Sequence, residues 1–147
     1  MSINTIRLVT IKDPTTKEPK PFAAVLRLGV NGNVVDNWAM GGLIVEINDD
    51  ATLAEHAFYK PGKGTKTTIH PDTKIQFKGF KIPFYKECVD TCLLFHKKLG
   101  IHSIGWDVAI TENGPVIIEG NDNWELSLMQ VACGPLKSKF NKYHSWS

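Results

Sequence analysis

Apolar, β-forming residues gather in runs along the first half of the chain, separated by polar stretches, a pattern typical of β-strands. A polar, proline-bearing loop separates the first two such runs, and a Gly-Gly pair interrupts the third, as at a bulge or a close approach of another group. The strands predicted in this half are residues 3–11, 22–29 and 36–48, with short strands near 53–58 and 66–69 in an otherwise irregular segment.

The second half of the chain combines helical and strand periodicities. Pro83 opens a predicted helix over about residues 84–99, whose apolar residues recur at helical spacing until a glycine stops it. A second helix is predicted over 124–133, ended by a Gly-Pro pair. Between the helices, residues 105–111 and 115–121 form a predicted β-hairpin. The sequence therefore predicts an α+β fold, mainly an antiparallel sheet with two helices packed on it.

The register of this hairpin decides which side chains meet. A two-residue Asn-Gly turn would pair Val108 with Glu119 and mix polar and apolar positions on both faces. A three-residue loop, with Gly114 at a positive φ, pairs Val108 with Ile118 and Asp107 with Glu119. Because a one-residue slip moves every side chain to the other face, we expect the register that keeps one face apolar.

In the expected register, Ile117, Glu119 and Asn121 share the face opposite to Val116 and Ile118. Asp107 and Glu119 then face each other, and like charges in this position destabilise a sheet unless something positive lies between them. Two carboxylates and an amide oxygen suit a hard cation such as Mg²⁺. Two other interpretations remain open: acids that only face solvent, and an acid pair of the kind that retaining glycosidases hold about 5 Å apart.

Composition limits the class of protein. The chain has 147 residues, 42% of them hydrophobic, which suffices for one domain with a core. The net charge of +2 and scattered basic residues give no nucleic-acid footprint, and no apolar run approaches the roughly 18 residues of a membrane span. No signal peptide opens the chain, and three cysteines, an odd number, indicate reduced thiols in a cytoplasmic protein. Cys88, Cys92 and His96 follow helical spacing and are interpreted as helix-face residues rather than metal ligands.

Several motifs, in this order, resemble a known family. GWDVAIT followed by GPVIIEGN resembles the C-terminal lobe of ATP-grasp enzymes, and the closer similarity is to the sugar-transfer-associated ATP-grasp family, which is linked to polysaccharide biosynthesis. The resemblance covers residues 3–135, and we expect residues 1–135 to be this lobe and residues 136–147 a basic, aromatic tail. The other motifs that carry it are Asn4-Thr5-Ile6-Arg7, Arg27-Leu28-Gly29, Asp36-Asn37 with Gly41-Gly42, His70-Pro71-Asp72-Thr73, Ile82-Pro83, Gln130 and Gly134.

The resemblance implies a site and a reaction. Asp107, Glu119 and Asn121 would hold Mg²⁺ against the β- and γ-phosphates of ATP, and Arg7 and Arg27 would stabilise phosphate charge during catalysis. A small-molecule carboxylate would attack the γ-phosphate to give an acyl-phosphate. For the two arginines, the alternative is a purely solubilising role on an exposed strand. The residues expected to approach the nucleotide or substrate are Asn37, Gly41, Gly42 and Ile117, although a turn and a simple bulge explain the first three equally well.

Two departures from the family pattern bear on activity. Only three residues precede Asn4, so we expect a C-terminal half whose partner is either an N-terminal lobe supplied in trans or a second copy of the chain. Many amide-forming ATP-grasp ligases carry an arginine where this chain has Gly105. A non-catalytic remnant that folds or dimerises, burying the edge of its N-terminal strand against a partner, is therefore the main alternative.

Overall fold

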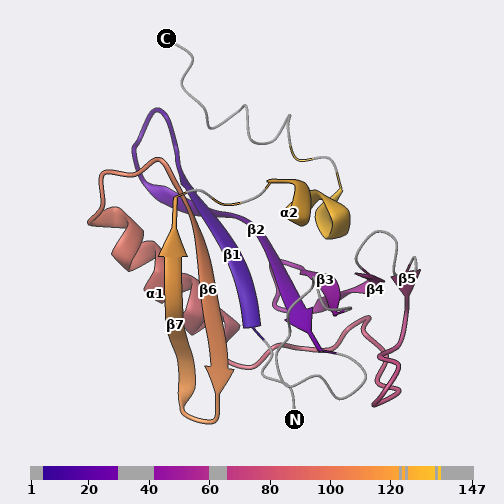
Figure 1. Cartoon of the computed structure of the whole chain (residues 1–147). Coiled ribbons are helices and arrows are strands. Elements are labelled where there is room, and N and C mark those ends of the chain that lie inside the picture. The colour runs from indigo at the N-terminus through magenta and orange to yellow at the C-terminus, as the bar shows by residue number, and fades with distance from the viewer. Residues whose placement is uncertain are drawn as a thin grey trace.

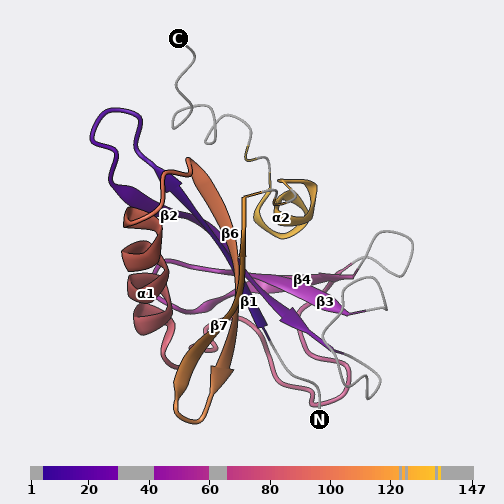
Figure 2. The ribbon, with the colours of Figure 1, turned by 60° about the vertical axis from the view of Figure 1, so that its left-hand side comes forward.

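A single antiparallel sheet organises the computed structural model of the chain, which describes residues 5–29, 42–59, 66–122, 124, 126–134 and 136. The sheet has seven strands in the order β5-β4-β3-β2-β1-β6-β7, and the two helices lie on its opposite faces (Figures 1 and 2). The α+β class and the antiparallel sheet with two helices are thus confirmed. The elements are β1 (Thr5–Lys12), β2 (Pro19–Leu28), β3 (Leu43–Ile47), β4 (Leu53–Tyr59), β5 (Lys66–Thr67), α1 (Tyr85–Lys97), β6 (Ser103–Thr111), β7 (Gly114–Asn121) and α2 (Leu126–Cys133).

β1 lies in the interior of the sheet, paired with β2 on one side and β6 on the other. Its Ile6 and Leu8 belong to the core under α1, while Val9 and Ile11 belong to the core on the other face. A strand buried on both faces has a nearly continuous apolar sequence, which suits the centre of a sheet. The expectation that the N-terminal strand offers a free edge is therefore wrong, because the edge strands of the described sheet are β5 and β7.

The larger core lies between the sheet and α1. The helix buries Tyr85, Cys88, Cys92 and His96, which recur at three- and four-residue spacing along one face. This confirms that the two cysteines and the histidine are helix-face residues. Burial of each large apolar side chain stabilises the fold by about 1.5–3 kcal/mol, so this layer supplies most of the hydrophobic stabilisation. The strands contribute mainly Ile6, Leu8, Leu26, Val45, Trp106 and Val108.

A series of buried hydrogen bonds connects α1 to β1 and β6. Trp106 Nε1 donates to Thr10 Oγ1 at 2.8 Å, and Thr10 Oγ1 lies 2.7 Å from His96 Nδ1. His96 Nε2 lies 2.7 Å from the carbonyl oxygen of Ile101. Because a carbonyl can only accept, Nε2 carries the proton and Nδ1 accepts from the Thr10 hydroxyl. Burial lowers the pKa of His96, in keeping with this neutral tautomer.

The β6–β7 hairpin differs from the expected register near its turn. Thr111 pairs with Gly114 across a two-residue turn, and Gly114 has a φ of 116° that favours glycine. The three-residue loop and the pairing of Val108 with Ile118 are therefore wrong. A bulge beside Asp107 then adds one residue to β7 and restores the pairing of Asp107 with Glu119, which is confirmed.

The bulge also changes which apolar side chains face the core. Ile117 pairs with Val108 and packs against the core under α1. Val116 and Ile118, expected on the buried face, are 51% and 58% exposed. Strict alternation along β7 predicts the reverse, and the extra residue of the bulge is the physical reason for the difference.

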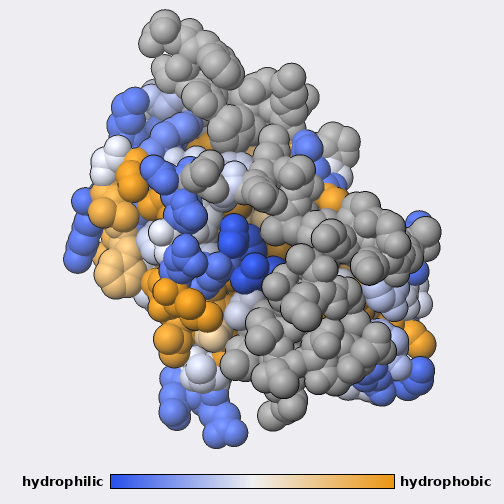
Figure 3. Space-filling view, in the orientation of Figure 1, coloured by the Kyte–Doolittle hydropathy of each residue, from blue (hydrophilic) through white to orange (hydrophobic). Residues whose placement is uncertain are grey.

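The second core is smaller and lies on the opposite face, beneath α2. It consists of Val9, Ile11, Phe22, Val25, Met129 and Leu136. It covers only part of that face, which leaves the stretch of sheet beside β6 and β7 open to charged side chains (Figure 3). No helix within the described ranges is long and apolar enough to cross a membrane.

Candidate functional site

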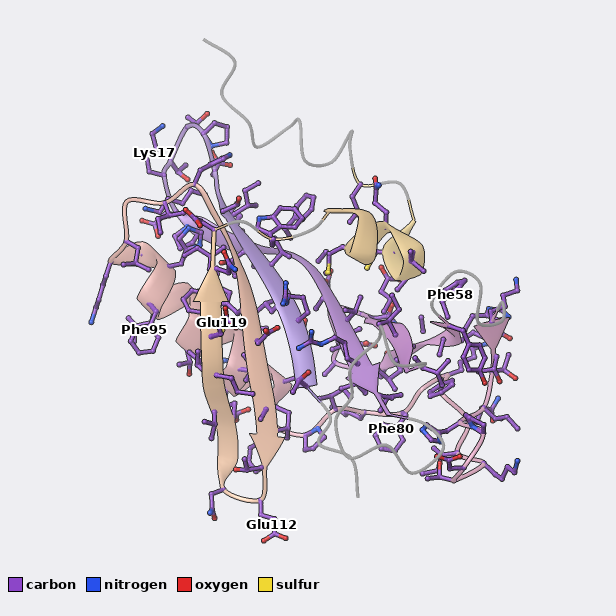
Figure 4. The ribbon with its side chains drawn as sticks, in the orientation of Figure 1. Lys17, Phe58, Phe80, Phe95, Glu112 and Glu119 are labelled. Atoms are coloured by element: carbon purple, nitrogen blue, oxygen red, sulfur yellow. The ribbon has the colours of Figure 1, made fainter. Side chains whose placement is uncertain are left out.

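A row of charged side chains crosses four neighbouring strands on the face that carries α2. Arg27 comes from β2, Arg7 from β1, Asp107 from β6 and Glu119 from β7. Glu119 projects from β7 on the side nearest the viewer in Figure 4, and hydrophilic side chains gather at the centre of the same face in Figure 3. Apolar side chains gather beside these hydrophilic ones in Figure 3, and Val116 and Ile118 of β7 are exposed.

Asp107 is held by both arginines. Arg7 forms a two-pronged contact with it, from Nε to Oδ1 at 2.6 Å and from Nη2 to Oδ2 at 3.1 Å. Arg27 adds a third bond, from Nη2 to Oδ1 at 3.0 Å. The side chains of Arg7, Arg27 and Asp107 are only 17%, 19% and 15% exposed, so solvent screens this cluster less than a surface ion pair.

Strand pairing explains why these residues converge. Arg7 is the cross-strand neighbour of Asp107, so the two side chains leave the sheet side by side. Arg27 is the neighbour of Thr5, whose hydroxyl oxygen accepts a hydrogen bond from Arg27 Nε at 3.0 Å. This bond directs the guanidinium across β1 toward Asp107. Sheet order thus brings together residues up to 100 positions apart in the sequence.

The positive charge beside the Asp107–Glu119 pair comes from this chain's own guanidinium groups. Glu119 is exposed and lies directly opposite Asp107, and Asn121 follows on the same face. Among the described residues, no group of three or more histidine, cysteine, aspartate or glutamate side chains is placed to hold a metal ion, so a cation here would depend on two carboxylates and the amide of Asn121. Three cavities in the described part of the chain lie away from the row, and one of them, of about 660 Å³, lies beside the N-terminal end of α1.

Gly105 is explained by the side chain that covers it. It lies opposite Asn121 on β7, and a β-carbon at this position would lie 2.6 Å from Trp124 Cβ and 3.5 Å from Arg7 Nη1. Trp124 is fixed over the glycine by a 3.0 Å hydrogen bond from its Nε1 to Ser103 Oγ. Arg7, reaching over from β1, therefore brings its guanidinium close to Gly105 on the same side of the sheet as Trp124.

The structure says less about the other residues that the sequence predicts to approach the nucleotide or substrate. Gly42 is buried directly before β3, whose Ile44 is the cross-strand neighbour of Arg27. Ile117 lies on the other face of the sheet, in the core under α1, and its role in binding stays a prediction. Asn37 and Gly41 lie outside the described residues.

The sequence analysis assigns no role at the site to three residues that lie beside the row. They are Thr5, which orients Arg27, Trp124, which covers Gly105, and Ile118, which the bulge exposes beside Glu119. The Asn-Thr-x-Arg motif was a signal for Thr5. The exposure of Ile118 has no signal in the sequence, because a regular strand would bury it.

The donor chemistry of the row fits Mg²⁺. Asp107 and Glu119 offer carboxylate oxygens and Asn121 an amide oxygen from one sheet face, and Mg²⁺ takes a few such ligands together with phosphate oxygens and water. The arginine bonds leave Asp107 one lone pair for a cation, on Oδ2, since Oδ1 accepts two of the three bonds and each carboxylate oxygen has two lone pairs. A cation at this position would nevertheless compete with two guanidinium groups for Asp107.

Comparison with known proteins defines the class and then the family. A family model described as sugar-transfer associated ATP-grasp matches residues 1–142. The ATP-grasp class is a nucleotide-binding one, and the sheet with its row of acids and arginines suits that class. Because the match spans nearly the whole sequence, the chain belongs to the sugar-transfer associated ATP-grasp family. This membership supports an ATP-grasp-type function in a sugar-transfer context. No curated protein matches the chain.

Proposed function

We propose that this chain binds Mg²⁺-ATP on the row formed by Arg27, Arg7, Asp107 and Glu119 and serves the activation of a small-molecule carboxylate as an acyl-phosphate. The observation that carries the proposal is the position of Asp107, bonded to two arginines and directly opposite a second carboxylate. Fixed cations and oxygen ligands on adjacent strands are what phosphoryl transfer requires, since its catalysis is mostly positioning and neutralisation of charge.

Each residue of the row has a role in this proposal. Arg7 and Arg27 bind the non-bridging oxygens of the terminal phosphates, for which a planar two-pronged guanidinium is well matched. Asp107, Glu119 and Asn121 hold Mg²⁺, which when bound neutralises phosphate charge. The exposed apolar side chains of β7 next to Glu119 offer a surface that a flat base would cover.

The proposed step is a direct displacement. A carboxylate oxygen of the substrate forms a bond to the γ-phosphorus, and the bond from this phosphorus to the oxygen that bridges it to the β-phosphate breaks, so that ADP leaves. The acyl-phosphate that forms is then open to an amine or another nucleophile. The family's sugar-transfer context makes polysaccharide biosynthesis the proposed setting. A further lobe supplied in trans, or a second copy of the chain, would cover the nucleotide.

A non-catalytic role is the second candidate, and one observation favours it. Asp107 accepts three hydrogen bonds from Arg7 and Arg27, so the cluster satisfies its own charges as a purely structural ion-pair network does. In that case the row would stabilise the sheet and turn nothing over.

Calorimetric titration of the chain with Mg²⁺ and a non-hydrolysable ATP analogue separates the two candidates. We expect wild-type binding that Glu119→Gln weakens at least about tenfold, since one charged ligand is lost. Glu112→Gln is the matched control, because it removes the same charge from the exposed tip of the same hairpin and should leave binding unchanged. Wild-type protein that fails to bind, or Glu119→Gln that binds like wild type, would contradict the proposal.

A further inference from the structure

In the proposed site, the carboxylate of Asp107 has two competing partners: the two arginines and the divalent cation. Its Oδ1 accepts bonds from Arg7 at 2.6 Å and Arg27 at 3.0 Å, and its Oδ2 accepts from Arg7 at 3.1 Å. A divalent cation bound between Asp107 and Glu119 would stand beside these two guanidinium groups. Arginine remains charged at any accessible pH, so the repulsion is relieved only by movement of the arginines or by an anion between the charges.

An oxyanion supplies this relief. A phosphate or sulfate group bound by Arg7 and Arg27 satisfies the same N–H donors that now bond Asp107, which leaves the carboxylate free to serve a cation. It also places negative charge between the guanidinium groups and the cation. Without the oxyanion, movement of Asp107 away from Arg7 and Arg27 would leave two largely buried guanidinium groups without their ion-pair partner, which costs free energy.

We propose that Asp107 passes from Arg7 and Arg27 to a divalent cation when an oxyanion binds the two arginines, so that oxyanion and cation bind with positive coupling. This inference rests on the proposed function, because it concerns the same row. Couplings between two ligand sites of this kind change affinity about fivefold or more, and each ligand raises the affinity of the other by the same factor.

Thr5 is the positioning residue in this exchange. It is 5% exposed, and its hydroxyl oxygen holds Arg27 Nε at 3.0 Å, independently of Asp107. When Asp107 turns to a cation, this bond keeps the guanidinium of Arg27 over the sheet where the oxyanion lies. Loss of the hydroxyl should therefore weaken the response to the oxyanion while leaving the cation ligands intact.

Electron paramagnetic resonance of free Mn²⁺ tests the coupling directly, with Mn²⁺ standing in for Mg²⁺. The chain is titrated with Mn²⁺ in chloride and then in sulfate at equal ionic strength, with sulfate as the oxyanion because it binds metal ions only weakly. We expect sulfate to raise the Mn²⁺ affinity of the wild type at least about fivefold. An affinity that sulfate leaves unchanged or lowers, or Mn²⁺ binding that is undetectable in both salts, would overturn the inference.

Variants identify the groups responsible. Arg27→Gln should bind Mn²⁺ more tightly than wild type in chloride and lose most of the response to sulfate, because one competing cation is gone. Lys86→Gln removes the same charge from an exposed position on α1 and should behave as wild type. Arg27→Gln with the full wild-type response would refute the exchange.

The Thr5 variants separate positioning from folding. Thr5→Val, nearly the same shape without the hydroxyl, should reduce the response to sulfate, and Thr5→Ser should restore it. Equal responses in the two would remove Thr5 from the scheme. Because no nucleotide is present, a failure of ATP-analogue binding in the separate calorimetric titration leaves these readouts unaffected, so failure of the coupling can be told apart from failure of nucleotide binding.

Discussion

Substitution of Gly105 by alanine should disturb the wall of the candidate site more than its size implies. The added β-carbon would lie 2.6 Å from Trp124 Cβ, far inside ordinary van der Waals contact. Trp124 Cβ is fixed to the backbone, so relief requires the main chain at Trp124 or β6 to move by close to 1 Å. Such overpacking costs about 1–3 kcal/mol, which lowers the Tm of a domain of this size by roughly 3–10 °C.

The consequence for the site follows from the bonds of Trp124. Its displacement strains the 3.0 Å bond from Nε1 to Ser103 Oγ and opens the face beside Arg7. Urea unfolding followed by circular dichroism measures the loss of stability, with Gly100→Ala as control, because an added β-carbon there meets nothing within 4 Å. Gly105→Ala within about 0.5 kcal/mol of wild type would refute the close packing of Trp124 on Gly105.

Three further predictions concern the fold around the site. Thr10→Val should cost about 2–4 kcal/mol in urea unfolding, because Trp106 Nε1 and His96 Nδ1 both lose their partner. Burial lowers the pKa of His96, so the unfolded chain binds the proton first: stability should fall as the pH drops below about 6.5, by up to about 1.4 kcal/mol per unit, and His96→Gln should flatten this slope. Ile117→Ala should cost about 1–3 kcal/mol, whereas Ile118→Ala should stay within about 0.5 kcal/mol of wild type.

Matched variants sharpen each of these outcomes. Thr10→Ser keeps the hydroxyl and should retain most of the stability, so equal losses in the serine and valine variants would argue against the hydrogen-bond chain. A wild-type slope in His96→Gln would mean that other groups dominate the acid response. Ile118→Ala more destabilising than Ile117→Ala would contradict the bulge in β7.

Local sequence pattern predicted the elements because strand alternation and helical spacing are local signals. The strand at 53–58 and the helix at 84–99 lie close to β4 and α1. The pairing of Asp107 with Glu119 was also accessible, since a hairpin joins residues that are near in sequence.

The departures arise where geometry depends on more than local pattern. The turn is one residue shorter than predicted, and the bulge at Asp107 adds one residue to β7. Because the two differences offset each other, Asp107 still pairs with Glu119 although the predicted register near the turn is wrong. The convergence of Arg7 and Arg27 on Asp107 needs β1 between β2 and β6, and no local feature of the sequence states this order. The same order made the N-terminal strand internal rather than an edge.

In the proposed function, Asp107 and Glu119 hold a metal ion against phosphates bound by Arg7 and Arg27. The most direct test is a crystal structure of the chain with Mn²⁺ and a non-hydrolysable ATP analogue, with the metal located by its anomalous scattering. We predict a peak at about 2.0–2.3 Å from oxygens of both carboxylates, with phosphate oxygens on the guanidinium groups. A nucleotide and metal bound elsewhere, with both arginines still on Asp107, would show that the row is not the nucleotide site.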